Sequence, residues 1–246
     1  CALPISTLWA GTNSGAIYVF QITLPETDKR DSAAVECQLG KEIHLKHRAP
    51  VLFIAVIDRT ATPLPSAFET QNGRAKEPDM TGGHFVLIVS EEQFKIFSLP
   101  NLKPQNKYKL TAHEGSKVRR MALVDFFSKS DENYKENDLV ILTNQGDTQV
   151  FTIPNLRRQL KSQVIRKDNI NGIVSALLTS TGEGFYPNSP SEFVRFSLSP
   201  RRVCRANCSV EIKDGVRPPP PEPEPEPETP AATEDAEAGT EAAADA

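Results

Sequence analysis

Apolar and polar residues alternate in short runs along most of this chain, and such alternation is typical of β-strands. Apolar side chains at the three- and four-residue spacing of an amphipathic helix are almost absent. The first example covers residues 8–12 and 16–22, and in its second run Ile17 and Val19 point to the same side. The connecting residues 13–15 read Asn-Ser-Gly. Because Asn and Gly favour tight reversals, this segment predicts a β-hairpin.

The same hairpin pattern recurs further along the chain, at residues 84–100, 138–154 and 184–199. Aligned on their second strands, the repeats share an aromatic position, occupied by Phe20, Phe97, Phe151 and Phe196. The spacings are 77, 54 and 45 residues, and the last approaches the roughly 40 to 45 residues of a four-stranded propeller blade. The longer spacings predict insertions, which we assign to polar surface loops at residues 59–83 and 128–137.

Two further strands are expected between consecutive hairpins. Apolar runs at residues 50–57, 118–125 and 172–178 predict buried inner strands, and polar runs at 107–111 and 157–164 predict outer strands. Four strands per repeat indicate an all-β chain built from WD40-type β-propeller blades. A β-sandwich is the alternative, since it also needs short strands at regular spacing. The recurring order of inner strand, hairpin and outer strand favours the propeller.

The repeats predict a partial β-propeller over residues 1–213, with about four blades and an incomplete first one. The chain begins with Cys1 rather than Met, and only residues 1–7, interrupted by Pro4, precede the first hairpin. We therefore expect upstream sequence to complete the fold. Without that sequence, residues 1–217 should be aggregation-prone or only partly folded, because apolar faces would remain in water.

The end of the chain has a different composition, and we predict a disordered acidic tail over residues 214–246. Residues 218–246 contain seven Glu, two Asp, eight Pro and eight Ala, with no aromatic or branched aliphatic side chain to build a core. Without these nine acids the net charge changes from −4 to +5. That modest, dispersed positive charge argues against nucleic acid as a partner. No apolar run approaches the roughly 20 residues of a membrane span, and no signal peptide is visible, so we expect a cytosolic protein.

The sequence contains no recognisable catalytic arrangement, such as a nucleophile with its base, convergent carboxylates, metal-ligand spacing or a phosphate-binding glycine loop. The four histidines are His44, His47, His84 and His113, and their contexts favour structural or solvated roles. The four cysteines lack the spacing of a disulfide scaffold. We therefore expect neither an enzyme nor a metal or other cofactor.

Basic residues gather twice, in a short run with Lys117, Arg119 and Arg120 and in a longer segment that contains Arg157, Arg158, Lys161, Arg166 and Lys167. Such a patch attracts anionic lipid or an acidic partner, at about 1 kcal/mol per basic residue near a charged membrane. The acidic tail of the same chain could compete for it, because the tail is tethered. The alternative is an exposed face of an outer strand, where charge discourages edge pairing.

Among the hydroxyl residues that precede proline, three are candidate phosphorylation sites for proline-directed kinases. They are Ser189, Ser199 and Thr229. Phosphorylation at any of them would add a charge near −2.

Several segments of the chain resemble the carboxy-terminal part of the lethal(2) giant larvae family of WD40-type polarity and tumour-suppressor proteins. The likeness covers roughly residues 6–199, and its most specific stretches are GGHFVLIVSEEQFKIFSLP at 82–100 and KLTAHEG at 109–115. The resemblance implies two consecutive β-propellers, with this chain supplying the closing blades of the second. The Pro-Glu tail has no counterpart in that resemblance.

The resemblance also implies a non-enzymatic cortical scaffold. Its partners would be the Par polarity complex with atypical protein kinase C, non-muscle myosin II, and syntaxin-type SNAREs of polarised exocytosis. Its location would be the cytoplasm, the cell cortex and the lateral plasma membrane, in association with the cytoskeleton. The family's phosphorylated, Ser-rich basic membrane loop has no match here, so membrane contact would come mainly from sequence outside this chain. The alternatives are a syntaxin-binding exocytosis regulator, or a GTPase regulator acting through blade loops such as the one with Arg74.

Overall fold

A computed structural model describes residues 5–29, 31–64, 70–71, 74–75, 82–202 and 207–209. These residues all belong to one compact unit, Cys1–Glu211. The predicted tail at 214–246 lies outside the described residues, as does all of a second unit, Ile212–Ala246, that contains it.

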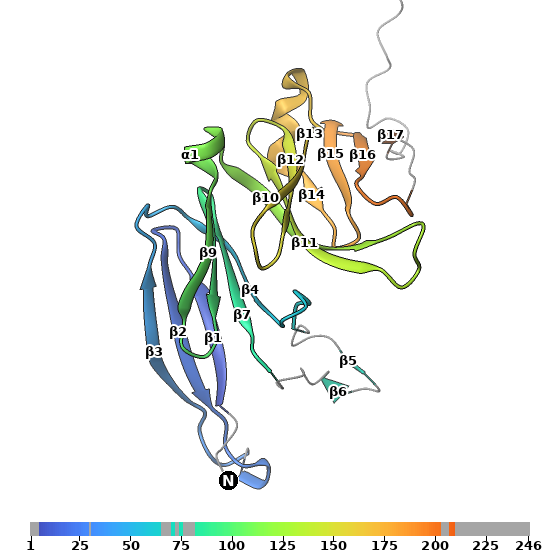
Figure 1. The fold of residues 1–246 in the computed structure, drawn as a ribbon. Helices are drawn as coiled ribbons and strands as arrows, with labels where there is room; N and C mark the ends of the chain where they lie inside the picture. The colour runs from blue at the N-terminus through green and yellow to red at the C-terminus, as the bar shows by residue number, and fades with distance from the viewer. Residues whose placement is uncertain are drawn as a thin grey trace, which may run out of the picture. The chain divides into compact units, whose positions relative to one another are not determined.

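Almost all regular structure consists of antiparallel β-sheets, which follow one another along the chain (Figure 1). The first sheet contains β1 (Ile5–Gly11), β2 (Ala16–Thr23) and β3 (Glu36–His44). The second contains, in spatial order, β4 (Val51–Ile57), β7 (Phe85–Ser90), β8 (Gln93–Ser98) and β9 (Lys103–Lys109). The chain segment that connects β4 to β7 contains a separate two-stranded ribbon of β5 (Thr70–Gln71) and β6 (Arg74–Ala75).

The second half of the unit repeats the four-stranded arrangement twice. The third sheet contains β10 (Val118–Phe127), β11 (Lys135–Thr143), β12 (Asp147–Thr152) and β13 (Arg158–Gln163). The fourth contains β14 (Leu177–Leu178), β15 (Glu183–Ser189), β16 (Glu192–Ser197) and β17 (Asn207–Ser209). The helical pieces are short: η1 (Thr27–Lys29), α1 (Leu110–Glu114) and η2 (Lys167–Ser175). The prediction of an all-β fold of blade-like sheets is confirmed.

The hydrophobic core lies between successive sheets, because alternate side chains of one strand face opposite neighbours. On β7, Leu87 and Val89 join a cluster shared with the third sheet, whereas Val86 and Ile88 join a cluster shared with the first. The second and third sheets meet through aromatic rings, including an edge-to-face contact between Phe94 and Phe151 with centroids 5.1 Å apart. Burying one such side chain contributes about 1.5–3 kcal/mol.

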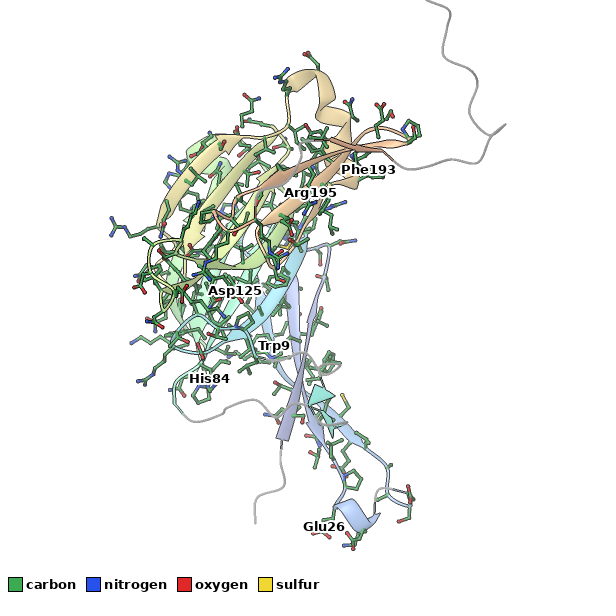
Figure 2. All side chains as sticks on the ribbon, turned by 90° about the vertical axis from the view of Figure 1, so that its right-hand side faces the viewer. Trp9, Glu26, His84, Asp125, Phe193 and Arg195 are labelled. Atoms are coloured by element: carbon green, nitrogen blue, oxygen red, sulfur yellow. The ribbon has the colours of Figure 1, made fainter. Side chains whose placement is uncertain are left out.

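The other face of the first sheet contains an exposed apolar stripe. The register pairs Leu8 with Phe20 and Phe20 with Leu39, so the three side chains cross the sheet in one row. Leu8 and Leu39 are 53% and 55% exposed. Trp9, on the opposite face, packs against the core shared with the second sheet (Figure 2). The β2–β3 connection, with Glu26, extends beyond the end of this sheet in the same view.

Several elements differ from the sequence predictions; the ribbon of β5 and β6, for example, lies within the segment 59–83 that was predicted as a loop. Strand β3 was not predicted, because its side chains are almost all exposed and leave no apolar alternation to detect. The outer strand predicted at 107–111 was misplaced: β9 already begins at Lys103, and α1 follows it, held by the buried Leu110. The inner strand predicted at 172–178 is mostly the 3-10 helix η2, and only β14 remains of it.

The helical segment before β14 packs closely on the fourth sheet. A Cβ atom at Gly172, within η2, would lie only 2.6 Å from the Pro187 carbonyl oxygen of β15. The helical turn therefore packs backbone to backbone on the fourth sheet, which glycine permits.

Candidate functional site

The predicted basic segment lies on β13 and its flanks, where two of its residues bind one carboxylate of the neighbouring sheet. Glu114, at the end of α1, accepts a hydrogen bond from Arg158 Nη1, and its Oε2 lies 2.7 Å from Lys161 Nζ. Lys161 Nζ also lies 3.5 Å from Asp147. The Lys161 hydrogen bond is the main reason that the pKa of Glu114 lies below its usual value, and it raises the pKa of Lys161 in return. These contacts join the second and third sheets.

The remaining members of the predicted patch do not join this cluster. Arg157 and Arg166 are exposed, and neither takes part in an ion pair recorded within the described ranges. The side chain of Lys167 lies outside the described residues. The segment is therefore partly neutralised rather than uniformly positive.

A different positive surface, which we name the lysine cluster, is formed by Lys46, Lys95, Lys107 and Lys109. Lys95 of β8 lies directly opposite Lys107 of β9 in the register. Burial lowers the pKa of Lys95 most, and the charges of Lys107, Lys46 and Lys109 lower it further. No ion pair involves any of the four in the part of the chain that the structure describes. Because like charges opposite one another destabilise a sheet, this surface is suited to an anionic partner.

The sequence did not reveal the lysine cluster, because its members come from three separate segments. Lys46 belongs to the β3–β4 connection, Lys95 to β8, and the other two to β9. The only local signal was the alternation of Lys107 and Lys109, which places both side chains on one face of an outer strand.

The candidate phosphorylation sites lie in different surroundings. Ser189 ends β15, and its Oγ lies 3.4 Å from a carboxylate oxygen of Glu192. Ser199 follows β16 and is half-buried. Thr229 lies outside the described residues.

Ser199 lines a hollow of about 480 Å³ between the third and fourth sheets. The other lining residues are Asp125, Phe127, Ser180, Thr181, Arg201 and Arg202. Asp125, labelled in Figure 2, belongs to β10, and its carboxylate lies 3.0 Å from Lys135 Nζ. The guanidinium of Arg201 lies 5.3 Å from the centre of the Phe127 ring and donates two hydrogen bonds to the Ser128 carbonyl, at 2.9 and 2.6 Å.

The histidines are spread over separate elements. His44 lies 3.0 Å from Glu42 at an exposed site, His84 is buried before β7, and His113 lies in α1 against the Tyr108 ring. Within the described ranges, no three His, Cys, Asp or Glu side chains gather as metal ligands. No helix there is long and apolar enough to cross a membrane.

One carboxylate has a strongly perturbed protonation equilibrium. Asp138 of β11 is 2% exposed, and its Oδ1 has no hydrogen-bond partner. Burial, assisted by the charge of Glu136, raises its pKa to about 7. Asp138 faces Val124 and Thr152 in the sheet and is a structural feature of the third sheet rather than part of the hollow.

Successive antiparallel sheets that pack on one another in chain order define this protein as a β-repeat protein of the blade type. The family model described as "Lethal giant larvae(Lgl) like, C-terminal" matches residues 6–221. The chain belongs to this family.

Curated relatives are similar to most of the chain. The chain is 50% identical over 210 residues to the human "Lethal(2) giant larvae protein homolog 1", covering 84% of this chain and 20% of that protein. It is 46% identical over 205 residues to the human "LLGL scribble cell polarity complex component 2", covering 83% and 20%. The "Lethal(2) giant larvae protein" of Drosophila pseudoobscura pseudoobscura is 35% identical over 258 residues, covering 84% and 22%. The chain thus spans about one fifth of these relatives.

Proposed function

We propose that this chain is part of a non-enzymatic scaffold of the cell cortex that organises cell polarity. Its membership of the lethal giant larvae family carries the proposal, and one relative is named as a component of a scribble cell polarity complex. The proposed partners are the Par polarity complex with atypical protein kinase C, non-muscle myosin II and syntaxin-type SNAREs. The proposed location is the cytoplasmic side of the cortex and of the lateral plasma membrane.

The lysine cluster is the proposed contact for an acidic segment of such a partner. Its four ammonium groups have no carboxylate partner in the described part of the chain. An acidic partner would remove the repulsion between Lys95 and Lys107, and complementary charge would also speed association.

A pull-down with the full-length protein tests this proposal. Recovery of the kinase complex and of syntaxin is compared between the unchanged protein, a Lys95→Glu/Lys107→Glu variant and a Lys103→Glu control. Lys103 is exposed on the same strand and lies opposite Ser98 rather than another lysine. We expect the double variant to lose at least about tenfold in affinity for one partner, and the control to lose little. If both variants recover the kinase complex and syntaxin equally well, the lysine cluster is not the contact. If the unchanged protein recovers neither partner, the proposed scaffold function is wrong.

Membrane contact by this chain alone should be weak and sensitive to salt, because its uncompensated positive charges are few. Co-sedimentation with vesicles containing phosphatidylserine, at low and at physiological ionic strength, measures it. Tight binding at physiological ionic strength would contradict this expectation.

We also propose that this chain has no enzymatic function. The alternative function is the regulation of a small GTPase. This alternative assigns a role to Arg74, whose side chain lies outside the described residues. We expect the chain to leave GTP hydrolysis by candidate small GTPases unchanged. Stimulation that an Arg74→Ala variant abolishes would establish this alternative.

A further inference from the structure

We propose that Ser199 is a phosphorylation site and that the hollow it lines binds the phosphate through Arg201 and Arg202. The local backbone supports this arrangement. The Arg202 N–H donates a hydrogen bond to the Ser199 carbonyl at 3.3 Å, so residues 199–202 form a tight turn with Pro200 at its second position. Both arginines and the serine therefore line the same hollow.

Charge in the hollow favours an anion. Arg201 contacts only neutral groups, the Ser128 carbonyl and the Phe127 ring, and takes part in no ion pair recorded for the described residues. Arg202 lies 3.4 Å from Glu183, and its side chain is 57% exposed. The one carboxylate that lines the hollow, Asp125, is balanced by Lys135.

The chemistry is phosphoryl transfer by a proline-directed kinase, which supplies ATP as the phosphoryl donor. The Ser199 Oγ attacks the γ-phosphorus of ATP; the Oγ–P bond forms, the bond to ADP breaks, and the hydroxyl proton is released to solvent. The product carries a charge near −2 and three strong acceptor oxygens. Guanidinium groups bind such oxygens in pairs, and Ser180 and Thr181 line the same space. The phosphate would thus compete with the Ser128 carbonyl for Arg201.

The chain provides a matched comparison at its other described Ser-Pro pair. Ser189 precedes Pro190, and its Oγ faces the Glu192 carboxylate instead of an arginine. A phosphate on Ser189 would meet like charge, whereas one on Ser199 would meet opposite charge. The two sites therefore predict opposite shifts in the second pKa of phosphoserine, which is about 6 without a partner.

The test uses the whole chain, phosphorylated with a proline-directed kinase and ATP, with the modified residue identified by mass spectrometry. Phosphorus NMR then follows the phosphoserine signal through pH 4–8, in the folded protein and in urea. We expect the second pKa of phospho-Ser199 to lie at least about 0.5 unit below its value in urea. Arg201→Gln and Arg202→Gln variants should each remove part of that shift. In a Ser199→Ala chain, phospho-Ser189 should titrate at or above its value in urea.

Two results would overturn the proposal. One is a pKa of phospho-Ser199 that is the same in the folded protein and in urea. The other is a folded chain that the kinase leaves unmodified at Ser199, while a synthetic peptide of residues 194–204 is modified at that serine.

Discussion

At the scale of single residues, the hairpin turns restrict most strongly which amino acid can occupy a position. Gly146, between β11 and β12, has a φ of +87°, and its carbonyl accepts hydrogen bonds from the N–H groups of Val164 and Ile165. A Cβ atom there would lie 2.3 Å from the Ile165 carbonyl oxygen. The sequence alone indicated a turn at this glycine, but the contact with Ile165 depends on a strand end 19 residues further along the chain.

A Gly146→Ala substitution should therefore destabilise the protein by about 3 kcal/mol or more, because it combines left-handed strain with a backbone clash. The control is Gly115→Ala. Gly115 also has a positive φ, of 65°, but a Cβ atom there would have no neighbour within 4 Å, so we expect a loss of about 1–2 kcal/mol. Urea unfolding of both variants measures the difference, and equal losses would contradict the clash.

Asp138 gives a prediction that depends on pH. Its pKa is raised from 3.8 to about 7, so the folded state binds more protons than the unfolded state between these values. Stability therefore falls as pH rises through this range, and the full cost of the buried charge is present above pH 7. An Asp138→Asn variant should be more stable than the unchanged protein at pH 8, by about 2 kcal/mol or about 4–8 °C in Tm.

The gain should disappear near pH 4, where both side chains are neutral. Thermal unfolding at the two pH values provides the measurement. A gain of equal size at both would show that the charge of Asp138 is not its cause.

At the scale of elements, polar side chains join one sheet to the next at defined points. Asn106 Nδ2 of β9 lies 3.0 Å from the Pro154 carbonyl that follows β12, and Arg120 Nε of β10 lies 2.8 Å from the Ala176 carbonyl before β14. Glu114 adds the ion pairs between α1 and β13. These contacts fix the register between neighbouring sheets, which apolar packing alone leaves less specific.

A Glu114→Gln variant should lose about 1 kcal/mol, because Arg158 and Lys161 remain half-exposed and can return to solvent. The direction in which this stabilisation changes with pH follows from the lowered pKa of Glu114. Its stabilisation is present above the unfolded value, near 4.5, and is lost as pH falls through the lower folded value. The variant and the unchanged protein should thus differ at pH 7 and converge at acidic pH in urea unfolding. A constant difference would assign the loss to packing instead.

The sequence predicted elements well where a strand is buried and poorly where most of its side chains meet water. The hairpins at β7–β8 and β11–β12 were predicted because their strands are short apolar runs, which the structure buries on both faces. Strand β3 has no such run, and all its side chains except the half-buried Ile43 are exposed. The lysine cluster and the hollow at Ser199 join residues from distant segments, which no local pattern can reveal.

At the scale of the whole molecule, the described sheets contact their neighbours in chain order, and the first sheet retains the exposed apolar stripe of Leu8, Phe20 and Leu39. The chain corresponds to about one fifth of its curated relatives. The stripe therefore suits burial against another surface, and each Å² left in water costs about 25 cal/mol.

The 246-residue chain should consequently self-associate through this stripe. A Leu8→Lys/Leu39→Lys variant should sediment with a smaller mean mass than the unchanged chain at equal concentration. Val35→Lys is the control, since Val35 is 56% exposed outside the strands. Analytical ultracentrifugation decides the question, and a monomeric unchanged chain would refute the expectation.

Each of the four larger sheets is built from an uninterrupted stretch of chain, at residues 5–44, 51–109, 118–163 and 177–209. During synthesis on the ribosome, a sheet can therefore complete its own hydrogen bonds as soon as its last strand emerges. The following inner strand then emerges beside a finished surface, which shortens the time that its apolar side chains spend without a partner. The sheets are thus synthesised in the same order in which they pack on one another. A pause in translation is least hazardous while the connections at residues 45–50, 110–117 and 164–176 are leaving the ribosome, because one sheet is then complete and the next has not begun to form.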